Sequence, residues 1–354
     1  MNKLSLCMII KNEEKVIGRC LESVKKLVDE IIIVDTGSTD LSKEICSKYT
    51  DKIYDYIWHD DFSAARNYSF SKASGDYILW LDADDVVPQS SLQELVFLKE
   101  KLFADTYMLK YDVSFLNNKP TFSFYRERIL KNCPSAIWHG CVHECITPFG
   151  KIEKLDISIE HRKLSAGDPD RNYKIYKKIS KERSLSPREQ YYYGRELFDH
   201  KKYKECIRVL KKFIQSNNAW IENVIDSCYI MSNCFLFLNK EEKQLDYLFK
   251  TFKYSKPRPN ICCKIGDYFL NKNNLLLSEY WYLLSLSYKD MTYNGGFVEN
   301  KYKCYYPALQ LSVVYFRLGN IAKAEYYNSV ADNEFSTETT RNNKALFNQL
   351  KLQK

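Results

Sequence analysis

The chain has 354 residues, of which 45% are hydrophobic and 28% charged, and its formal net charge is +8. This length allows two domains, and no segment approaches the ~20 apolar residues of a membrane helix, so we expect no integral membrane segment. The 12 cysteines are scattered without CxxC pairs. This pattern disfavours a disulfide framework or a zinc ribbon and favours a reducing cytoplasm.

The charge is unevenly distributed along the chain. Residues 1–165 carry 22 Lys and Arg against 25 Asp and Glu, whereas the remainder carries 31 against 20. The basic surplus of the second half either meets an anionic partner or keeps the protein soluble, and we favour solubility. We expect no nucleic-acid partner.

The first half alternates between strands and helices. The apolar run over residues 3–11 predicts a strand rather than a signal peptide, because acidic residues follow at once and no small-residue cleavage site is present. Apolar spacing predicts a helix over 13–27. Further elements are expected as strands over 30–35, 52–58 and 76–81 and as helices over 41–49 and 62–73. This alternation is typical of an α/β fold with a parallel, doubly wound sheet.

Acidic residues follow three of these strands. Asp35 ends the second, Asp61 follows the third, and Asp82 and Asp84 come directly after the buried run 76–81. The carboxyl ends of parallel strands share one edge of the sheet, where open α/β folds bind ligands. Carboxylates this close repel one another unless a cation lies between them, and a hard divalent metal carrying a phosphate suits them. The alternative is an acidic loop that caps the next helix.

Four motifs in this half resemble those of family 2 glycosyltransferases with the GT-A (Rossmann-like) fold, in order and spacing as well as in content. They are MIIKNEE at residues 8–14, IVDTGSTD at 33–40, DFSAARN at 61–67 and LDADD at 81–85. The resemblance implies a hexosyltransferase that uses a nucleotide-sugar, favouring a UDP-sugar, together with Mg²⁺ or Mn²⁺. It also implies that the following residues bind the nucleotide-sugar, with Asp82 and Asp84 also holding the metal: Asn12, Glu13, Asp35, Asp61, Arg66, Asn67, Asp82, Ala83 and Asp84.

The pattern changes after Asp85. A helix is expected over 90–103, followed by a hairpin of strands over 106–116 and 123–131 with its turn at 117–120. Arg126 and Arg128 share a face of the second strand. They either touch the donor phosphate or the acceptor, or they belong to a solvated strand face.

The segment WHGCVHE at residues 138–144 concentrates imidazole and thiol groups. His139, Cys141, His143 and Cys145 alternate, so they would share one face of a continuous strand. We disfavour a zinc site there, because neighbouring ligands on one strand seldom close a tetrahedron. A structural role is the alternative for each histidine.

The same segment resembles an element of a bacterial branch of these transferases that includes peptide S-glycosyltransferases of the sublancin type. The resemblance implies that Glu144 is the catalytic base with His143 beside it. It further implies that His161, at the end of the last strand of the domain, is the third metal contact beside Asp82 and Asp84.

The second half reads as helical repeats. Small residues at Gly194, Gly266 and Ser312 are each followed, nine and twelve positions later, by a bulky residue and then a small one. This spacing lets two helices pack closely, as in the tetratricopeptide (TPR) repeat. The segment 228–249 lacks the pattern, so we expect a degenerate array whose tyrosines mostly fill the core.

We therefore predict a GT-A catalytic domain over residues 1–165 and a TPR-like helical domain over 166–354. The predicted reaction is a metal-dependent, inverting sugar transfer to a Ser, Thr or Cys side chain of a peptide or protein that the repeats grip. One alternative is transfer to a cell-surface glycan or lipid-linked acceptor, and another is a non-catalytic scaffold. A homodimer through the helical domain is left open.

Overall fold

The computed structural model describes residues 2–116, 119–164, 167–216, 219–288 and 298–352. Its contacts divide the chain into two compact units, the first comprising Met1–Ser114 and Ser123–Ser184, the second Phe115–Phe122 and Leu185–Lys354. The predicted boundary between residues 165 and 166 falls outside the described residues. Helix α5 (Arg171–Glu182) lies in the first unit, whereas the sequence analysis placed it in the second domain.

The first unit is built on a mixed sheet in which the strand order is β3-β2-β1-β4-β7-β6-β10-β5. Strands β1 to β4 pair in parallel, as predicted for a doubly wound sheet, and β7 then joins β4 in the antiparallel sense. Strand β10 pairs in parallel with β6 and antiparallel with β5. The bounds are β1 Leu4–Ile10, β2 Glu30–Asp35, β3 Ile53–Asp55, β4 Tyr77–Trp80, β5 Asp85–Val86, β6 Thr106–Leu116, β7 Lys119–Lys131 and β10 Ile152–His161.

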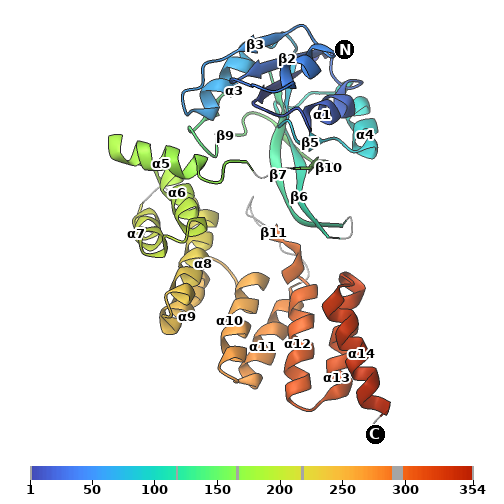
Figure 1. Ribbon diagram of the computed structural model, residues 1–354, viewed down its shortest axis with the longest axis vertical. Coiled ribbons are helices and arrows are strands. Elements are labelled where there is room, and N and C mark those ends of the chain that lie inside the picture. The colour runs from blue at the N-terminus through green and yellow to red at the C-terminus, as the bar shows by residue number, and fades with distance from the viewer. Residues whose placement is uncertain (1, 117–118, 165–166, 217–218, 289–297, 353–354) are drawn as a thin grey trace. The chain divides into compact units, whose positions relative to one another are not determined.

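Both faces of this sheet are buried. Successive side chains of a strand point to opposite sides, so a single strand contributes to the apolar cluster on each face. Leu4, Leu6 and Met8 of β1 pack into one apolar cluster, whereas Cys7 packs into another with Trp80. Helices α1 and α4 contact each other beside the sheet (Figure 1). The remaining helices of the unit, apart from α5, are α1 Ile17–Val24, α2 Ser42–Ser47, α3 Phe62–Phe70 and α4 Gln89–Lys99.

The segment over residues 138–146 is a hairpin, so the predicted continuous strand is wrong. Strands β8 (Trp138–His139) and β9 (Cys145–Ile146) pair antiparallel, with His139 opposite Cys145. Between them Gly140 and His143 have φ values of 94° and 51°, which reverse the chain. The predicted alternating face of imidazoles and thiols is therefore not formed.

The second unit is a series of helical hairpins, which confirms the predicted repeat pattern. Helices α7, α11 and α13 begin at Tyr203, Leu275 and Ile321, the bulky positions of the pattern. The predicted close packing is also present, because a Cβ on Gly194 would lie 2.2 Å from Leu210 of the partner helix. The helices are α6 Pro187–Asp199, α7 Tyr203–Ile214, α8 Ile221–Phe237, α9 Glu241–Lys250, α10 Pro259–Asn271, α11 Leu275–Ser287, α12 Tyr305–Arg317, α13 Ile321–Glu334 and α14 Glu338–Leu352.

The tip of the β6–β7 hairpin belongs to the second unit. Residues Phe115–Phe122 cluster with it, although the predicted turn residues 117–118 lie outside the described ones. The side-chain amide of Asn300 donates to the carbonyl of Pro120 over 3.4 Å, and β11 (Val298–Glu299) pairs with β7. The chain thus enters this unit first through the hairpin tip and again at Leu185.

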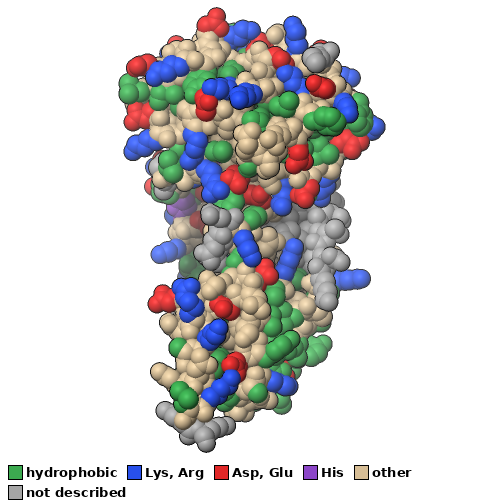
Figure 2. Space-filling model, turned by 90° about the vertical axis from the view of Figure 1, so that its right-hand side faces the viewer, with side chains coloured by type: hydrophobic (Ala, Val, Ile, Leu, Met, Phe, Trp, Pro, Cys, Tyr) green, Lys and Arg blue, Asp and Glu red, His purple; other side chains and the backbone are tan. Residues whose placement is uncertain are grey.

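The surface of the molecule carries charges of both signs. On the face shown in Figure 2, Lys and Arg side chains are interspersed with Asp and Glu side chains. The role of the basic surplus in solubility stays a prediction. Within the described part of the chain, no helix combines the length and hydrophobicity needed to cross a bilayer.

Candidate functional site

A cleft of about 410 Å³ lies in the first unit, where the loops after β1 and β4 meet the residues around Glu144. Eight of the predicted site residues line it: Glu13, Arg66, Asp82, Ala83, Asp84, His143, Glu144 and His161. The structure therefore brings together residues that are up to 148 positions apart in the sequence, the separation of Glu13 from His161. Asn12, Asp35, Asp61 and Asn67 are not among the lining residues.

Asp84 and His161 lie side by side, as the metal-site prediction requires. Oδ1 of Asp84 is 3.3 Å from Nδ1 of His161, and both side chains are partly exposed. Asp85 completes a cluster in which one potential ligand atom of each residue lies within 4.8 Å of the others. The family resemblance implies Asp82, not Asp85, as the other carboxylate of this group.

Asp85 serves as a buried support for this pair. Its side chain is fully buried, and Oδ2 accepts from Nη1 of Arg128 and from the backbone of Asp82, both over 2.9 Å. Oδ1 accepts from the Tyr111 hydroxyl over 2.7 Å, and the same hydroxyl lies 2.8 Å from Nδ1 of His161. Because both oxygens of Asp85 are engaged inside the protein, Asp84 and His161 are the two side chains of the cluster that remain available to a ligand in the cleft.

The electrostatics of the cleft suit a cation. Burial alone would lower the pKa of His161, but hydrogen bonds to Asp84 and Asp85 raise it to about 10. Burial, together with the charges of Asp84 and Asp82, raises the pKa of Glu13 to about 7. Both pKa values record the negative potential of the neighbouring carboxylates, which a positive charge placed between these groups would neutralise.

The donor set fits Mg²⁺ or Mn²⁺. Carboxylate oxygen suits both ions and imidazole nitrogen suits Mn²⁺, and two protein ligands leave positions for phosphate oxygens and water. A bound cation would replace a proton of His161, since an imidazole ligand must be neutral. In the part of the chain that the structure describes, His139, Cys141, His143 and Cys145 form no comparable cluster.

Asp82 forms an ion pair with Arg66, a contact that the motifs do not predict. Its Oδ1 accepts from Nη2 of Arg66 over 2.6 Å, and Nε of Arg66 donates to Oε1 of Glu144 over 2.7 Å. Burial favours the neutral form of Asp82, but the charges of Arg66, Arg128 and Arg126 hold its pKa below its usual range. The structure thus joins two residues predicted to bind the nucleotide-sugar, Asp82 and Arg66, with the predicted base Glu144 in one chain of ion pairs.

His143 lies beside Glu144, as predicted, and packs against α5. Its ring stacks on Tyr176 with the centroids 6.2 Å apart and the planes at 12°. The Tyr176 hydroxyl donates to the carbonyl of Val142 over 3.1 Å. Helix α5 therefore helps to fix the loop that carries both residues.

The four predicted nucleotide-binding residues outside the cleft lining hold the backbone in place. Asn12 accepts from the backbone of Thr39, and Asp35 accepts from the backbone of Ser38. Asp61 caps α3 by accepting from the backbone of Ala64. The side chain of Asn67 donates to the carbonyl of Trp138 and accepts from its backbone amide, over 3.0 and 2.8 Å. Their roles in nucleotide binding stay predictions.

The structure also adds cleft residues that the motifs did not identify. Trp80, Lys163 and Arg171 line the cleft together with Arg126, one of the two strand arginines. Arg128 is fully buried, so the alternative of a solvated strand face is wrong for it. The apolar neighbours of Trp80 in the sequence indicated burial and gave no sign of a cleft position. Lys163 and Arg171 follow the last strand, where no motif guides prediction.

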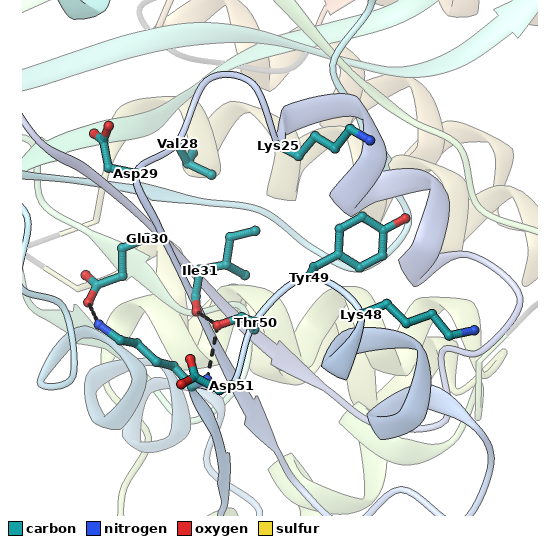
Figure 3. A pocket seen from close by; sticks show the side chains of 10 residues that line it. Lys25, Val28, Asp29, Glu30, Ile31, Lys48, Tyr49, Thr50 and Asp51 are labelled. Carbon is teal, nitrogen blue, oxygen red and sulfur yellow. Dashed lines mark hydrogen bonds and ion pairs between the residues drawn. The ribbon is translucent and has the colours of Figure 1, made fainter.

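A second hollow, of about 470 Å³, lies where β2 begins (Figure 3). Its lining residues include Lys25, Glu30, Lys48 and Tyr49 and none of the predicted site residues. Glu30 forms an ion pair with Lys52 there. We therefore assign the candidate site to the cleft of Asp84, Glu144 and His161.

The chain is similar to known proteins over parts of its length. Residues 5–153 match the model of the family described as Glycosyl transferase family 2. The SPbeta prophage-derived glycosyltransferase SunS of Bacillus subtilis is 26% identical over 251 residues, which cover 66% of this chain and 58% of that protein. A TPR repeat-containing protein of Synechococcus elongatus is 46% identical over 95 residues, 27% of this chain and 24% of that protein. The matched residues thus span 58% of the length of SunS and 24% of the length of the TPR repeat-containing protein.

Solved structures give weaker likenesses. S. aureus TarS 1-349 in complex with UDP-GlcNAc has a TM-score of 0.39 at 15% identity, with 94% of this chain and 91% of that chain covered. Glucosyl-3-phosphoglycerate synthase from Mycobacterium tuberculosis, in complex with Mn²⁺ and UDP-glucose, has a TM-score of 0.36 at 13% identity, covering 51% and 78%. These scores are too low to support an argument. The family match thus shows that residues 5–153 are similar to glycosyl transferase family 2.

Proposed function

We propose that the protein is a glycosyltransferase that moves a sugar from a nucleotide-sugar, a UDP-sugar above all, to a Ser, Thr or Cys side chain of a peptide or protein. The observation that carries the proposal is the cleft that the residues matching the family 2 model form together with the end of β10 and the start of α5. There the partly exposed Asp84–His161 pair and the carboxylate of Glu144 line one cavity. Such a cavity offers places for a cation, a diphosphate and an acceptor.

Asp84 and His161 would hold Mg²⁺ or Mn²⁺. When bound, the cation would supply Lewis-acid stabilisation of the negative charge on the departing diphosphate. Arg126, Lys163 and Arg171 lie in the same cleft and add positive charge for the same anion. Asp82, held by Arg66, would orient the donor.

Glu144 would act as the general base. It takes the proton of the acceptor hydroxyl or thiol while the acceptor oxygen or sulfur forms its bond to the anomeric carbon. The bond from that carbon to the diphosphate breaks at the same time, and the nucleoside diphosphate leaves with the electron pair. A single displacement of this kind inverts the configuration at the anomeric carbon.

The helical repeats support a peptide or protein acceptor, since arrays of this kind present extended surfaces for partner chains. The resemblance of the segment around Glu144 to peptide S-glycosyltransferases points the same way. A peptide acceptor fits a cytoplasmic protein, and so do cysteines that form no disulfide in the described part of the chain.

A thermal-shift panel of UDP- and GDP-sugars with Mn²⁺ tests the donor, followed by metal-dependent hydrolysis of the sugar-nucleotide that stabilises the protein most. We expect stabilisation by one UDP-sugar and release of UDP that EDTA abolishes. A panel without a shift and without hydrolysis would leave the non-catalytic scaffold as the better description. Flotation of the protein with anionic vesicles would favour a lipid-linked acceptor over a peptide.

A further inference from the structure

We infer that Arg66 is a positioning residue that fixes Glu144 for proton transfer, and that the adjacent Asn67 secures the loop carrying Glu144. The inference rests on the proposed function for its chemical meaning, but its geometry can be tested without activity. It differs from the role implied by the motif, in which Arg66 and Asn67 bind the nucleotide.

The guanidinium of Arg66 has two carboxylate partners in different directions. Nε donates to Oε1 of Glu144 over 2.7 Å, and Nη2 donates to Oδ1 of Asp82 over 2.6 Å. The side chains of Arg66 and Glu144 are only 9% and 12% exposed, so water screens this contact weakly. A planar guanidinium with two bound edges fixes the distance between the two carboxylates.

Two tryptophans restrain the same guanidinium. Its central carbon lies 4.7 Å from the ring centroid of Trp138 and 5.1 Å from that of Trp80. The two indoles contact each other with centroids 4.8 Å apart. Arg66 therefore has little freedom to turn away from Glu144 toward a ligand.

Asn67 holds the hairpin that leads to Glu144. Its side-chain amide donates to the carbonyl of Trp138, and its side-chain oxygen accepts from the Trp138 backbone amide. Trp138 begins β8, and Glu144 directly precedes β9 of the same hairpin. Arg66 and Asn67, neighbours on α3, thus grip the hairpin at two places, one at its start and one at the candidate base.

This arrangement leaves one oxygen of Glu144 for chemistry. Among the described residues, Oε1 has a hydrogen-bond partner in Arg66, whereas Oε2 has none. With Oε1 anchored, Oε2 has a fixed direction from which to receive a proton. Positioning of a reacting group at this level typically affects turnover far more than it affects ground-state binding.

The first test measures hydrogen exchange of the backbone amides over residues 138–146 in the full-length protein without ligand. Arg66→Lys keeps the charge but loses the second bound edge, and Asn67→Asp loses the donor to the Trp138 carbonyl. We expect exchange in this hairpin to become on the order of tenfold faster in both variants, since fewer contacts oppose local opening. Arg208→Lys, at an exposed position on α7, serves as the matched control. Unchanged exchange in both site variants would overturn the inference.

The second test compares turnover with nucleotide binding. With UDP and Mn²⁺ as the calorimetric probe and the most stabilising UDP-sugar as the hydrolysis substrate, Arg66→Lys should lower kcat on the order of 10- to 100-fold. The Kd for UDP should change less than about threefold, because a positioning residue acts through Glu144 and not on the nucleotide. Equal losses in kcat and UDP affinity would make Arg66 a nucleotide-binding residue and overturn the inference. If the wild-type protein binds no UDP-sugar, the proposed function fails, and the exchange experiment alone decides the positioning role.

Discussion

Among individual residues, Asp84 is the sharpest test of the cation site, because it is one of two cluster members that face the cleft. Asp84→Ala should lower turnover by roughly 100-fold or more, since the lost cation supplies several kcal/mol of transition-state stabilisation. Titration with Mn²⁺ followed by electron paramagnetic resonance should show the loss of the bound ion.

Asp156→Ala is the matched control, since that side chain is 82% exposed and forms a surface ion pair with Lys110. It should bind Mn²⁺ as the wild-type protein does. Turnover that persists in Asp84→Ala and in EDTA would refute the metal dependence.

Glu144→Gln separates base catalysis from binding. The amide keeps the size of the side chain but cannot take a proton, so we expect turnover to fall about 10² to 10⁴-fold. The affinity for UDP with Mn²⁺, measured by calorimetry, should change little. A parallel loss of affinity would mean that Glu144 supports the pocket and does not act as the base.

Much of the site could be predicted from the sequence because its residues lie in short motifs at strand ends. The resemblance predicts Asp84 and His161 as ligands of one metal, and Oδ1 of Asp84 lies 3.3 Å from Nδ1 of His161. Asp85 was missed as a partner of His161, because nothing in the sequence says that Tyr111 and Arg128 would surround it. The contact of Asp82 with Arg66 could not be predicted either, since it depends on how α3 packs against β1 and β2.

At the scale of secondary structure elements, the close packing of the helical hairpins can be tested by adding a single methyl group to a helical glycine. Gly194→Ala places a methyl group 2.2 Å from Leu210 and Gly266→Ala places one 2.7 Å from the ring of Tyr282. Overpacking of this kind costs about 1–3 kcal/mol, more than the ~1 kcal/mol that alanine gains over glycine in a helix. Urea unfolding followed by circular dichroism should therefore show a lower stability for both variants.

Gly18→Ala is the matched control on α1, because its new methyl group would meet Ile45 at an ordinary 3.4 Å. It should be neutral or up to about 1 kcal/mol more stable than the wild-type protein. Equal effects at the three glycines would show that packing between the paired helices is not what restricts Gly194 and Gly266.

Strand β2 begins with a carboxylate that makes the first unit sensitive to acid. Burial of Glu30 favours its neutral form, but hydrogen bonds from Lys52, Ser5 and Ser74 lower its pKa from 4.5 to about 2. Because the folded-state pKa lies below the unfolded one, Glu30 stabilises the fold above about pH 4.5, and that contribution is lost as the pH falls toward 2.

Glu30→Gln should therefore be less stable than the wild-type protein at pH 7, by about 1–3 kcal/mol, the usual range for hydrogen bonds to a charged group. The difference should shrink between pH 4.5 and pH 2 and vanish below. Chemical unfolding at a series of pH values measures it, and a difference that is constant with pH would contradict the assignment.

The elements were predicted better than their ends and their tertiary contacts. Strand β2 has the predicted bounds, because four consecutive apolar, β-branched residues between two carboxylates leave little choice. Strand β3 is shorter than predicted, with Ile53–Asp55 in place of 52–58. The hairpin at residues 138–146 was missed because His143 has a positive φ, which its sequence neighbours do not reveal.

For the whole molecule, the division of the chain makes a prediction about fragments. A fragment of residues 1–184 keeps α5, in which Ile175 and Tyr176 are buried, whereas a fragment of residues 1–165 loses it. Burying two such side chains contributes about 3–6 kcal/mol, so the shorter fragment should melt roughly 10 °C lower. Differential scanning calorimetry measures this, and equal melting temperatures would favour the boundary after residue 165.

The placement of residues 115–122 with the helical unit has a consequence for how such a protein can change over evolutionary time. A recombination event that replaced residues 185–354 would keep the tip of the β6–β7 hairpin but remove the helical residues with which it clusters. Exchange of the repeat array between related proteins would then require that the new array accommodates residues 115–122, which lie between two segments of the first unit. A swap of the repeat array alone would therefore remove the residues with which 115–122 cluster.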